Sequence, residues 1–233
     1  MYRICDIHSH ILPAMDDGCK NAEESVEVLK QAWDQGIQSM IATPHYYFNK
    51  ETPDAFLTRR NASETMLRGA IGDQKVPQFC CGAEVAYFRG IDHCEALERL
   101  CLGNSRYLLL ELPREPWTSQ LVREIQNLAV RGVTPVLAHF ERYLPVQSRR
   151  IVQEILEFEP LIQMNAESML GLFNGKHRKM LARGQVHLLG SDCHGKNYRP
   201  YILGQVLSNL EKRGMDLAAV EEWSNSVFHQ AKT

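Results

Sequence analysis

The sequence predicts a single α/β domain over residues 1–233, with parallel strands closed into a barrel. Two observations carry this prediction. Short apolar runs alternate with segments whose apolar residues recur at helical spacing, and several of these runs end in a histidine or a carboxylate. Strands joined through helices pair in parallel by right-handed crossovers. About seven strands fit this length as a barrel rather than as an open sheet.

Composition narrows the classes of function. The chain is 44% hydrophobic with a net charge of -2, so it has no basic excess to hold a nucleic acid. No apolar stretch approaches the roughly 20 residues that span a bilayer, and no signal peptide is recognised, so we expect a cytoplasmic protein without membrane insertion. Seven cysteines without a C-x-x-C pair are typical of reduced thiols.

The first segment brings metal-ligand residue types together. His8 and His10 are two residues apart behind apolar neighbours, so both imidazoles leave a strand on the same face. Asp16 and Asp17 follow in a turn that ends in Gly18. Imidazole and carboxylate ligands at the end of one buried strand suit a divalent cation.

A helix over residues 22–35 follows this turn. Asn21 and Glu24 form a capping-box pattern, and Leu29 and Trp33 continue a helical period. The later helices rest on the same spacing, often closed by glycine, and the strands are short apolar runs. In chain order the further elements are a strand at 39–43, a loop at 46–54, a helix at 55–69, strands at 78–86 and 107–112, a helix at 118–131, a strand at 133–138, a helix at 148–158, a strand at 161–165, a helix at 176–183, a strand at 186–190 and helices at 202–213 and 216–228.

Metal-ligand residue types mark the carboxyl ends of these strands, where barrel enzymes assemble their active sites. They are His8, His10, His45, Glu84, Glu111, His139, Asp192 and His194, with Asp17 in the first loop. Imidazole and carboxylate without thiolate favour Mn²⁺, Fe²⁺ or Zn²⁺. The pattern therefore predicts a centre of two or more metal ions at one mouth of the barrel.

The motifs that carry these residues resemble a known superfamily. H-S-H-I-L-P-x-x-D-D-G, A-T-P-H, G-A-E, L-L-L-E, L-A-H-x-E-R-Y, M-N-A-E-S and S-D-C-H together resemble the PHP (polymerase and histidinol phosphatase) superfamily. The first and fifth motifs are similar to those of bacterial manganese-dependent protein-tyrosine phosphatases from capsule and exopolysaccharide gene clusters. The resemblance covers nearly the whole chain. The chain departs from it at Asn225-Ser226, where an Asn-Pro pair is expected.

The resemblance implies a distorted (β/α)7 barrel with two or three divalent ions, Mn²⁺ first and Fe²⁺ or Zn²⁺ as alternatives. The implied ligands are His8, His10, Asp17, His45, Glu84, Glu111, His139, Asp192 and His194. Arg142 and Arg199 would contact phosphate, while a metal-activated hydroxide attacks phosphorus and Asp192, His194 or a bound water serves as general acid. The implied partner is the phosphotyrosine tail of a bacterial tyrosine autokinase; the oligomeric state stays open.

Alternative interpretations remain at this point. Cys193 and Arg199 form a C-x5-R segment typical of cysteine-dependent phosphatases, although strand alternation places Cys193 opposite Asp192 and His194. A small phosphomonoester such as histidinol phosphate could be the substrate, or the module could be non-catalytic. The aromatic residues near the mouth either accept a phosphotyrosine ring or only pack the loops. They are Tyr46, Tyr47, Phe48 and Tyr143.

Overall fold

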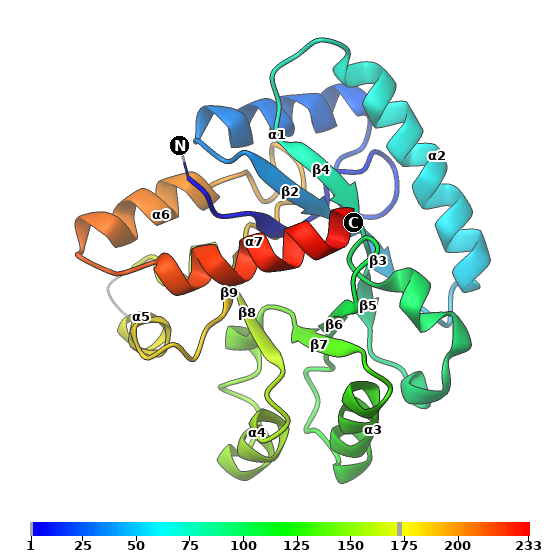
Figure 1. Cartoon of the computed structure of the whole chain (residues 1–233), viewed down its shortest axis with the longest axis vertical. Helices are drawn as coiled ribbons and strands as arrows, with labels where there is room; N and C mark the ends of the chain where they lie inside the picture. Colours follow the sequence, from blue (N-terminus) through cyan, green and yellow to red (C-terminus); the bar gives the residue numbers. More distant parts are fainter. Residues whose placement is uncertain (1, 172–173) are drawn as a thin grey trace.

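The computed structural model describes residues 2–171 and 174–233. Helices surround a set of short strands (Figure 1). The strands are β1 (Asp6–Ser9), β2 (Ser39–Ala42), β3 (His45–Tyr46), β4 (Gln78–Cys81), β5 (Glu84–Ala86), β6 (Tyr107–Glu111), β7 (Thr134–Leu137), β8 (Leu161–Asn165) and β9 (Leu188–Gly190). The α-helices are α1 (Ala22–Asp34), α2 (Pro53–Ile71), α3 (Ser119–Val130), α4 (Arg149–Leu156), α5 (Gly175–Ala182), α6 (Leu203–Lys212) and α7 (Ala218–Lys232). Short 3-10 helices are η1 (Ile91–His93), η2 (Glu95–Leu100), η3 (Phe140–Arg142) and η4 (Ala166–Met169).

Among the described residues, every pair of neighbouring strands is parallel, which confirms the α/β class. The strands form one sheet in the order β1-β2-β4 and a second in the order β3-β5-β6-β7-β8-β9. A bridge between Ser9 and Cys193 joins the end of β1 to the segment after β9. The two sheets together therefore curl until β1 approaches the segment that follows β9.

The single strand predicted over 78–86 is wrong, because the chain breaks it at Gly82 and Ala83. β4 pairs with β2, whereas β5 pairs with β3 and β6. A Cβ on Gly82 would lie 2.8 Å from the Leu102 side chain, so only glycine allows this close approach. Residues 39–46 break in the same way at Pro44, so part of the loop predicted at 46–54 belongs to β3.

Strand β1 contains a bulge at Ile7 and His8. Asp6 pairs with Met40 and Ser9 pairs with Ala42, so two residues of β1, Ile7 and His8, lie opposite the single residue between them on β2. An inserted residue redirects the side chains around it, and bulges of this kind are common beside active sites. His8 and His10 are two residues apart, and both imidazoles face Glu84.

The core has two parts. One cluster gathers apolar residues from several strands, including Ile7, Leu109 and Val136, and is completed by Val227 and Ala231 of α7. The larger cluster packs the other face of the strands against the surrounding helices. The Cys5 amide donates to Ser224 Oγ of α7 at 3.1 Å, which places α7 near the amino end of β1 (Figure 1). The opposite, carboxyl ends of the strands remain available for a site.

The helix predictions are confirmed with shifted ends. Asn21 caps α1 by accepting from the Glu24 amide at 2.9 Å. Glu24 does not complete the capping box; it accepts from the amides of Lys20 and Lys196 instead. The last helix runs through 225–226, so the departure from Asn-Pro does not interrupt it. Across the described residues, no helix combines the length and apolar character required to traverse a bilayer.

Candidate metal centre

Glu84 is the hub of a cluster of histidines. Its side chain is buried, and Oε2 lies 3.2 Å from Nε2 of both His8 and His10 and 3.0 Å from Nδ1 of His45. Glu84 Oε1 lies 2.8 Å from His139 Nε2. Burial alone would raise the pKa of Glu84, but the four imidazoles outweigh it and hold the pKa well below its ordinary value. The carboxylate is thus ionised and ready to bind cations.

The breaks in the strands explain how Glu84 meets these partners. His45 begins β3 and Glu84 begins β5, and the two residues are direct register partners. The sequence prediction placed both at strand ends; the structure places them just beyond a break, where the chain resumes as a second short strand. Glu111 alone closes its strand as predicted, with Oε1 at 3.5 Å from His139 Nε2.

Asp192 extends the cluster from the segment after β9. Its Oδ1 lies 3.5 Å from Nε2 of both His8 and His10. Its Oδ2 accepts from Arg142 Nη2 at 2.6 Å and forms an ion pair with Arg199 Nη1 at 2.6 Å, and the same Arg199 nitrogen donates to the Asp192 carbonyl at 3.0 Å. Both predicted phosphate-contacting arginines therefore lie beside the cluster, with about a quarter of each side chain exposed to solvent.

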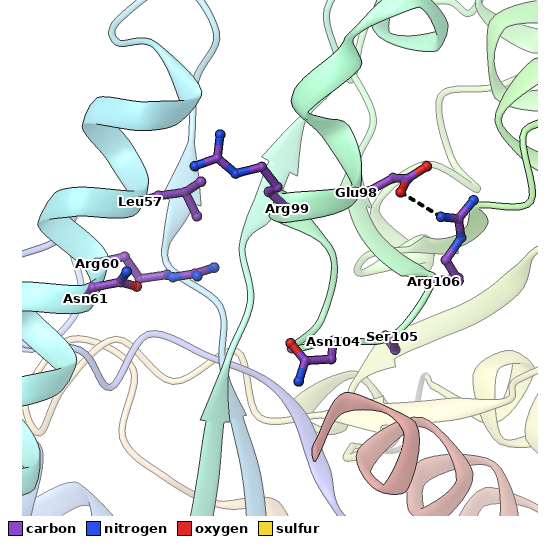
Figure 2. Close-up of a pocket in the computed structure, with 9 residues that line it drawn as sticks. Leu57, Arg60, Asn61, Glu98, Arg99, Asn104, Ser105 and Arg106 are labelled. Carbon is purple, nitrogen blue, oxygen red and sulfur yellow. Dashed lines mark ion pairs between the residues drawn. The ribbon is translucent and has the colours of Figure 1, made fainter. Parts of the chain in front are cut away.

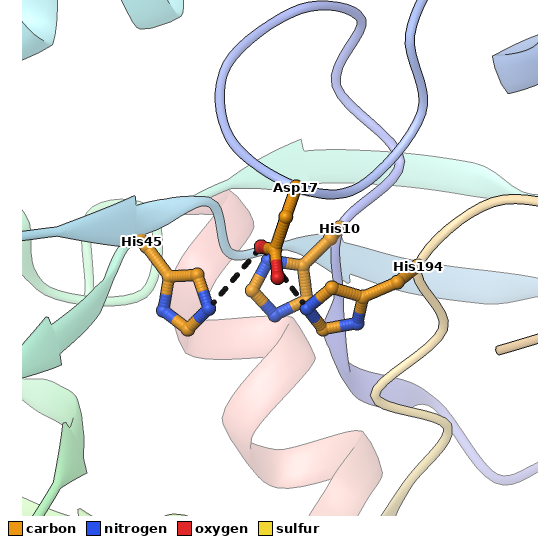
Figure 3. Close-up of side chains that lie close together, drawn as sticks. All are labelled: His10, Asp17, His45 and His194. Carbon is orange, nitrogen blue, oxygen red and sulfur yellow. Dashed lines mark ion pairs between the residues drawn. The ribbon is translucent and has the colours of Figure 1, made fainter. Parts of the chain in front are cut away.

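Asp17 closes the cluster on its outer side. Its Oδ1 lies 3.6 Å from His45 Nε2 and 3.4 Å from His194 Nε2, and Figure 3 shows the carboxylate pointing at both rings beside His10. The Asp17 side chain is 65% exposed, so this edge of the cluster faces solvent. All nine predicted metal ligands thus come together at one place.

The donor set fits metal ions. Among the described residues, three sets of side chains could each hold a metal ion, because the ligand atoms within each set all lie within 4.8 Å of one another. The sets are His10, Asp17, His45 and His194; His8, His10 and Glu84; and His45, Glu84 and Glu111. Glu84 Oε2 and His45 Nδ1 lie 3.0 Å apart, but both atoms are buried and neither forms a hydrogen bond of good geometry. The Nε2 atoms of His8 and His10 face each other at 3.3 Å. Divalent cations between these atoms would satisfy lone pairs that the protein leaves unpaired.

Two of these residues have unusual backbone conformations. His139 has φ 35° and Asp192 has φ 49°, in the left-handed region that non-glycine residues rarely adopt. The His139 amide is held by Gln163 Oε1 at 2.7 Å, and the Asp192 amide by the His8 carbonyl at 2.8 Å. Such conformations cost about 1–3 kcal/mol each and persist where surrounding contacts enforce them. Here they direct both side chains into the cluster.

Asp16 supports the cluster from outside. Its Oδ2 accepts from His10 Nδ1 at 2.7 Å and from the His45 amide at 2.8 Å, and its Oδ1 accepts from the Gly18 amide. This contact leaves His10 Nε2 as the nitrogen that faces the cluster, which is the arrangement of carboxylate-supported metal-binding histidines. The sequence signal was the first carboxylate of the Asp16-Asp17 pair, six positions after His10.

Sequence reasoning missed a second set of supporting residues. Gln163 Oε1 lies 3.2 Å from His8 Nδ1, and Asn165 Nδ2 donates to Asp192 Oδ2 at 2.6 Å. Both lie on β8, which supplies none of the predicted ligands. The only signal was the polar residue at alternate positions of an otherwise apolar run, since a buried amide needs a partner.

Two cavities border the cluster. One of about 500 Å³ is lined in part by Arg142, Asn165 and Glu141, and burial raises the pKa of Glu141 to about 7. The other, of about 420 Å³, is lined in part by Asp17, His45 and Tyr47. Both volumes suit a small organic group rather than a bare ion.

The four aromatic residues predicted near the mouth have different surroundings. Tyr46 and Tyr143 are buried and pack against Phe56 and Trp117 respectively, so they serve the core. Tyr143 also supports the site, because its hydroxyl lies 3.3 Å from His139 Nδ1. Tyr47 stays half-buried with its ring 5.3 Å from that of His45. Phe48 is 51% exposed and stacks on Phe88.

The cysteine-based alternative finds no support. Cys193 is fully buried among apolar residues, and burial raises the pKa of its thiol far above the ordinary value. Arg199 points to Asp192 and His194 instead, with Nη1 3.2 Å from His194 Nδ1. A phosphate held by Arg199 would therefore lie against the imidazole and carboxylate cluster.

Comparison with known proteins agrees with this geometry. Tyrosine-protein phosphatase CpsB of Streptococcus pneumoniae is 30% identical over 222 residues, covering 89% of this chain and 90% of that protein. Tyrosine-protein phosphatase YwqE of Bacillus subtilis is 29% identical, covering 89% and 84%. A solved structure from work on YwqE and CpsB, described as metal-dependent tyrosine phosphatases, has a TM-score of 0.76 and 26% identity over 98% of this chain and 93% of that one.

More distant structures share the fold alone. An organophosphorus hydrolase variant from Deinococcus radiodurans has a TM-score of 0.53 with 12% identity, over 99% of this chain and 93% of that one. The model of the family described as capsular polysaccharide synthesis, CpsB/CapC, matches residues 4–226. This chain belongs to the CpsB/CapC family.

Proposed function

We propose that this protein is a metal-dependent tyrosine phosphatase that hydrolyses phosphotyrosine esters. The observation that carries the proposal is the gathering of all nine predicted ligands around buried Glu84, with Arg142 and Arg199 at the edge of the same cluster. The names of the relatives support the same activity. A non-catalytic module would have no need for a complete donor set with two arginines beside it.

The donor set supports two or three divalent ions, Mn²⁺ first and Fe²⁺ or Zn²⁺ as alternatives. They would be held by His8, His10, Asp17, His45, Glu84, Glu111, His139, Asp192 and His194. Bound ions would supply an ionised water as nucleophile near neutral pH and neutralise charge on the phosphoryl oxygens. The broken β2–β3 and β4–β5 segments, counted as one strand each, support the distorted (β/α)7 arrangement of a single PHP-type domain over residues 1–233.

The two arginines orient the phosphoryl group. A guanidinium presents a planar set of donors that matches phosphate oxygens and keeps its charge at any working pH. Arg142 and Arg199 both donate to Asp192, so their positions are fixed before the substrate arrives. Asp192, His194 and a bound water are the candidate general acids for the departing phenolate. His194 lies between Asp17 and Arg199, and burial lowers the pKa of its imidazole to about 4.

The substrate we propose is the phosphotyrosine tail of a bacterial tyrosine kinase that controls capsule or exopolysaccharide synthesis. The half-buried ring of Tyr47 beside His45 and the two bordering cavities support an aromatic ester in an extended segment. The seven cysteines are all unpaired thiols, which supports the cytoplasm as the compartment.

The test compares matched peptides on one enzyme preparation. The protein loaded with Mn²⁺ should show a higher kcat/KM on a phosphotyrosine peptide than on its phosphoserine counterpart. Prolonged chelation should abolish both activities, and added Mn²⁺ should restore them. A higher kcat/KM on the phosphoserine peptide, or activity confined to histidinol phosphate, would move the assignment to a small phosphomonoester.

A further inference from the structure

A basic pocket of about 460 Å³ lies between α2 and η2, apart from the metal centre. Figure 2 shows Arg60 and Asn61 entering it from α2, Arg99 from η2 and Asn104 from the following loop. Asn104 and its neighbours precede β6, whereas the ligand Glu111 ends β6. The pocket therefore adjoins the end of that strand opposite the metal centre.

The pocket carries positive charge. Three arginines line it, Arg60, Arg99 and Arg106, against one carboxylate, Glu98. Arg99 contacts Asp54 at 2.6 Å and Arg106 contacts Glu98 at 2.7 Å, but the side chains in both pairs are about half exposed or more. Exposed pairs of this kind hold their partners weakly. Arg99 and Arg106 can therefore leave these carboxylates and bind a more highly charged anion.

Arg60 has no such partner. Among the described residues, no carboxylate oxygen lies within 4 Å of its guanidinium, which donates one hydrogen bond, to the Gly82 carbonyl at 3.2 Å. Its Nε atom is buried with no hydrogen-bond partner. Burial, with the charge of Arg99, lowers the pKa of Arg60. A partly buried cation in this state gains from any anion that reaches it.

The floor of the pocket is fixed in advance. The Gly103 amide donates to the Cys81 carbonyl at 2.9 Å, and the Asn104 amide donates to the Ala231 carbonyl at 3.0 Å. Gly103 has φ 55°, and a Cβ there would lie 2.0 Å from the Ala231 carbonyl oxygen, so only glycine allows this loop to dock on α7. The side-chain amides of Asn61 and Asn104 border this floor and form no hydrogen bond with any of the described residues. A ligand would meet an ordered backbone with two exposed side-chain amides at its rim.

We propose that this pocket is a second anion site, which binds a phosphoryl group through Arg60, Arg99 and the Asn104 side chain. The planar donors of arginine suit the tetrahedral dianion of a phosphate monoester, and the volume leaves room for a small organic group attached to it. The same phosphoryl chemistry arises from a small phosphorylated molecule or from a second phosphorylated residue of a protein substrate. The site is independent of the proposed catalysis, because it contains none of the metal ligands.

The first test counts phosphate sites by calorimetric titration of the Mn²⁺-loaded protein with inorganic phosphate. Wild type should bind at two sites, one of which matches the competitive inhibition constant for phosphate at the metal centre. Arg60→Gln should lose the other site, with affinity weakened about tenfold or more, and keep the same inhibition constant within a factor of about two. Arg123→Gln, at an exposed position on α3, is the matched control and should keep both sites.

A second variant guards against damage to folding by Arg60→Gln. Asn104→Asp leaves the backbone contact to Ala231 intact and places a negative charge at the exposed rim, so it should also weaken the second site. If wild type binds phosphate only at the site that matches the inhibition constant, or if both variants bind like wild type, the proposal is wrong. Failure of catalysis would show in the inhibition and turnover data and not in this second isotherm.

Peptides separate the two sources of the phosphoryl group. If a second phosphorylated residue is the ligand, Arg60→Gln should raise KM for a doubly phosphorylated peptide and leave KM for the singly phosphorylated peptide unchanged. If a small molecule is the ligand, both KM values should stay as in wild type while the second isotherm is still lost. Either pattern supports a phosphoryl site at Arg60, whereas an Arg60→Gln protein that retains the second isotherm excludes it.

Discussion

Neighbouring residues of one short segment face two different regions of the molecule. Asp192 and His194 enter the charged cluster, where Asp192 meets His8, His10 and both arginines. Cys193, between them, is buried in the apolar core, and its amide bonds Ser191 Oγ rather than any group of the site. One region stabilises charge and the other excludes it.

The difference shows how local geometry selects the chemistry. An extended segment sends alternate side chains to opposite sides, so one residue of a D-C-H run must leave the site when the other two enter it. In the cluster, the imidazoles hold the pKa of Glu84 low and keep it ionised; in the core, burial keeps the Cys193 thiol protonated. A nucleophilic cysteine needs cationic surroundings that favour its thiolate, whereas Cys193 lies in the apolar core.

Substitution of Glu84 should have the largest effect on metal content and turnover. Glu84→Gln removes the anion that lies within 3.2 Å of His8, His10 and His45, so bound metal should fall and kcat should drop by about 1000-fold or more. Metal analysis and phosphotyrosine turnover measure the two effects on one sample. Glu154→Gln, which breaks only a surface pair with Arg150, should change neither. Normal metal content with a normal rate in Glu84→Gln would contradict the assignment of the site.

The arginines should separate catalysis from metal binding. Arg142→Ala and Arg199→Ala each remove one charged donor beside Asp192, so kcat should fall by about 10- to 1000-fold while metal content stays unchanged. Arg123→Ala, on the outer face of α3, is the control. Metal loss in proportion to activity would mean that these arginines serve the Asp192 carboxylate and not the substrate.

The sequence predicted features that depend on neighbouring residues and missed features that depend on contacts between residues far apart in the chain. Alternation of strands and helices and the residue types at strand ends are local patterns, and they predicted the residues from His8 to His194 that the structure gathers into one cluster. The break at Gly82 was not predicted, because it arises from the approach of Leu102, which lies 20 positions further on. The roles of Gln163 and Asn165 were missed for the same reason, since each depends on a partner from another strand.

Substitution of Asp16 should weaken metal binding without abolishing it. It lies behind His10 and touches no other imidazole of the cluster, so Asp16→Asn should weaken metal affinity by about 10- to 100-fold. Activity should then return to near the wild-type rate at saturating Mn²⁺, because the ligand set is complete. Competition with a metal chelator measures the affinity, and Asp73→Asn at an exposed position is the control. An unchanged metal affinity would reduce Asp16 to a loop-capping residue.

The smallest effect on catalysis is expected at Cys193, although it lies between two residues of the site. Cys193→Ser should keep kcat and metal content within a few-fold of wild type, because the side chain contributes nothing to the cluster. It should instead destabilise the fold by about 1–3 kcal/mol, since the hydroxyl is buried among apolar residues. Denaturant unfolding and turnover on the same protein separate the two effects. Iodoacetate should react slowly with Cys193, because its thiol is protonated and inaccessible. An inactive Cys193→Ser protein that keeps its metal and its stability would place the nucleophile on the thiol and overturn the contrast between the two regions.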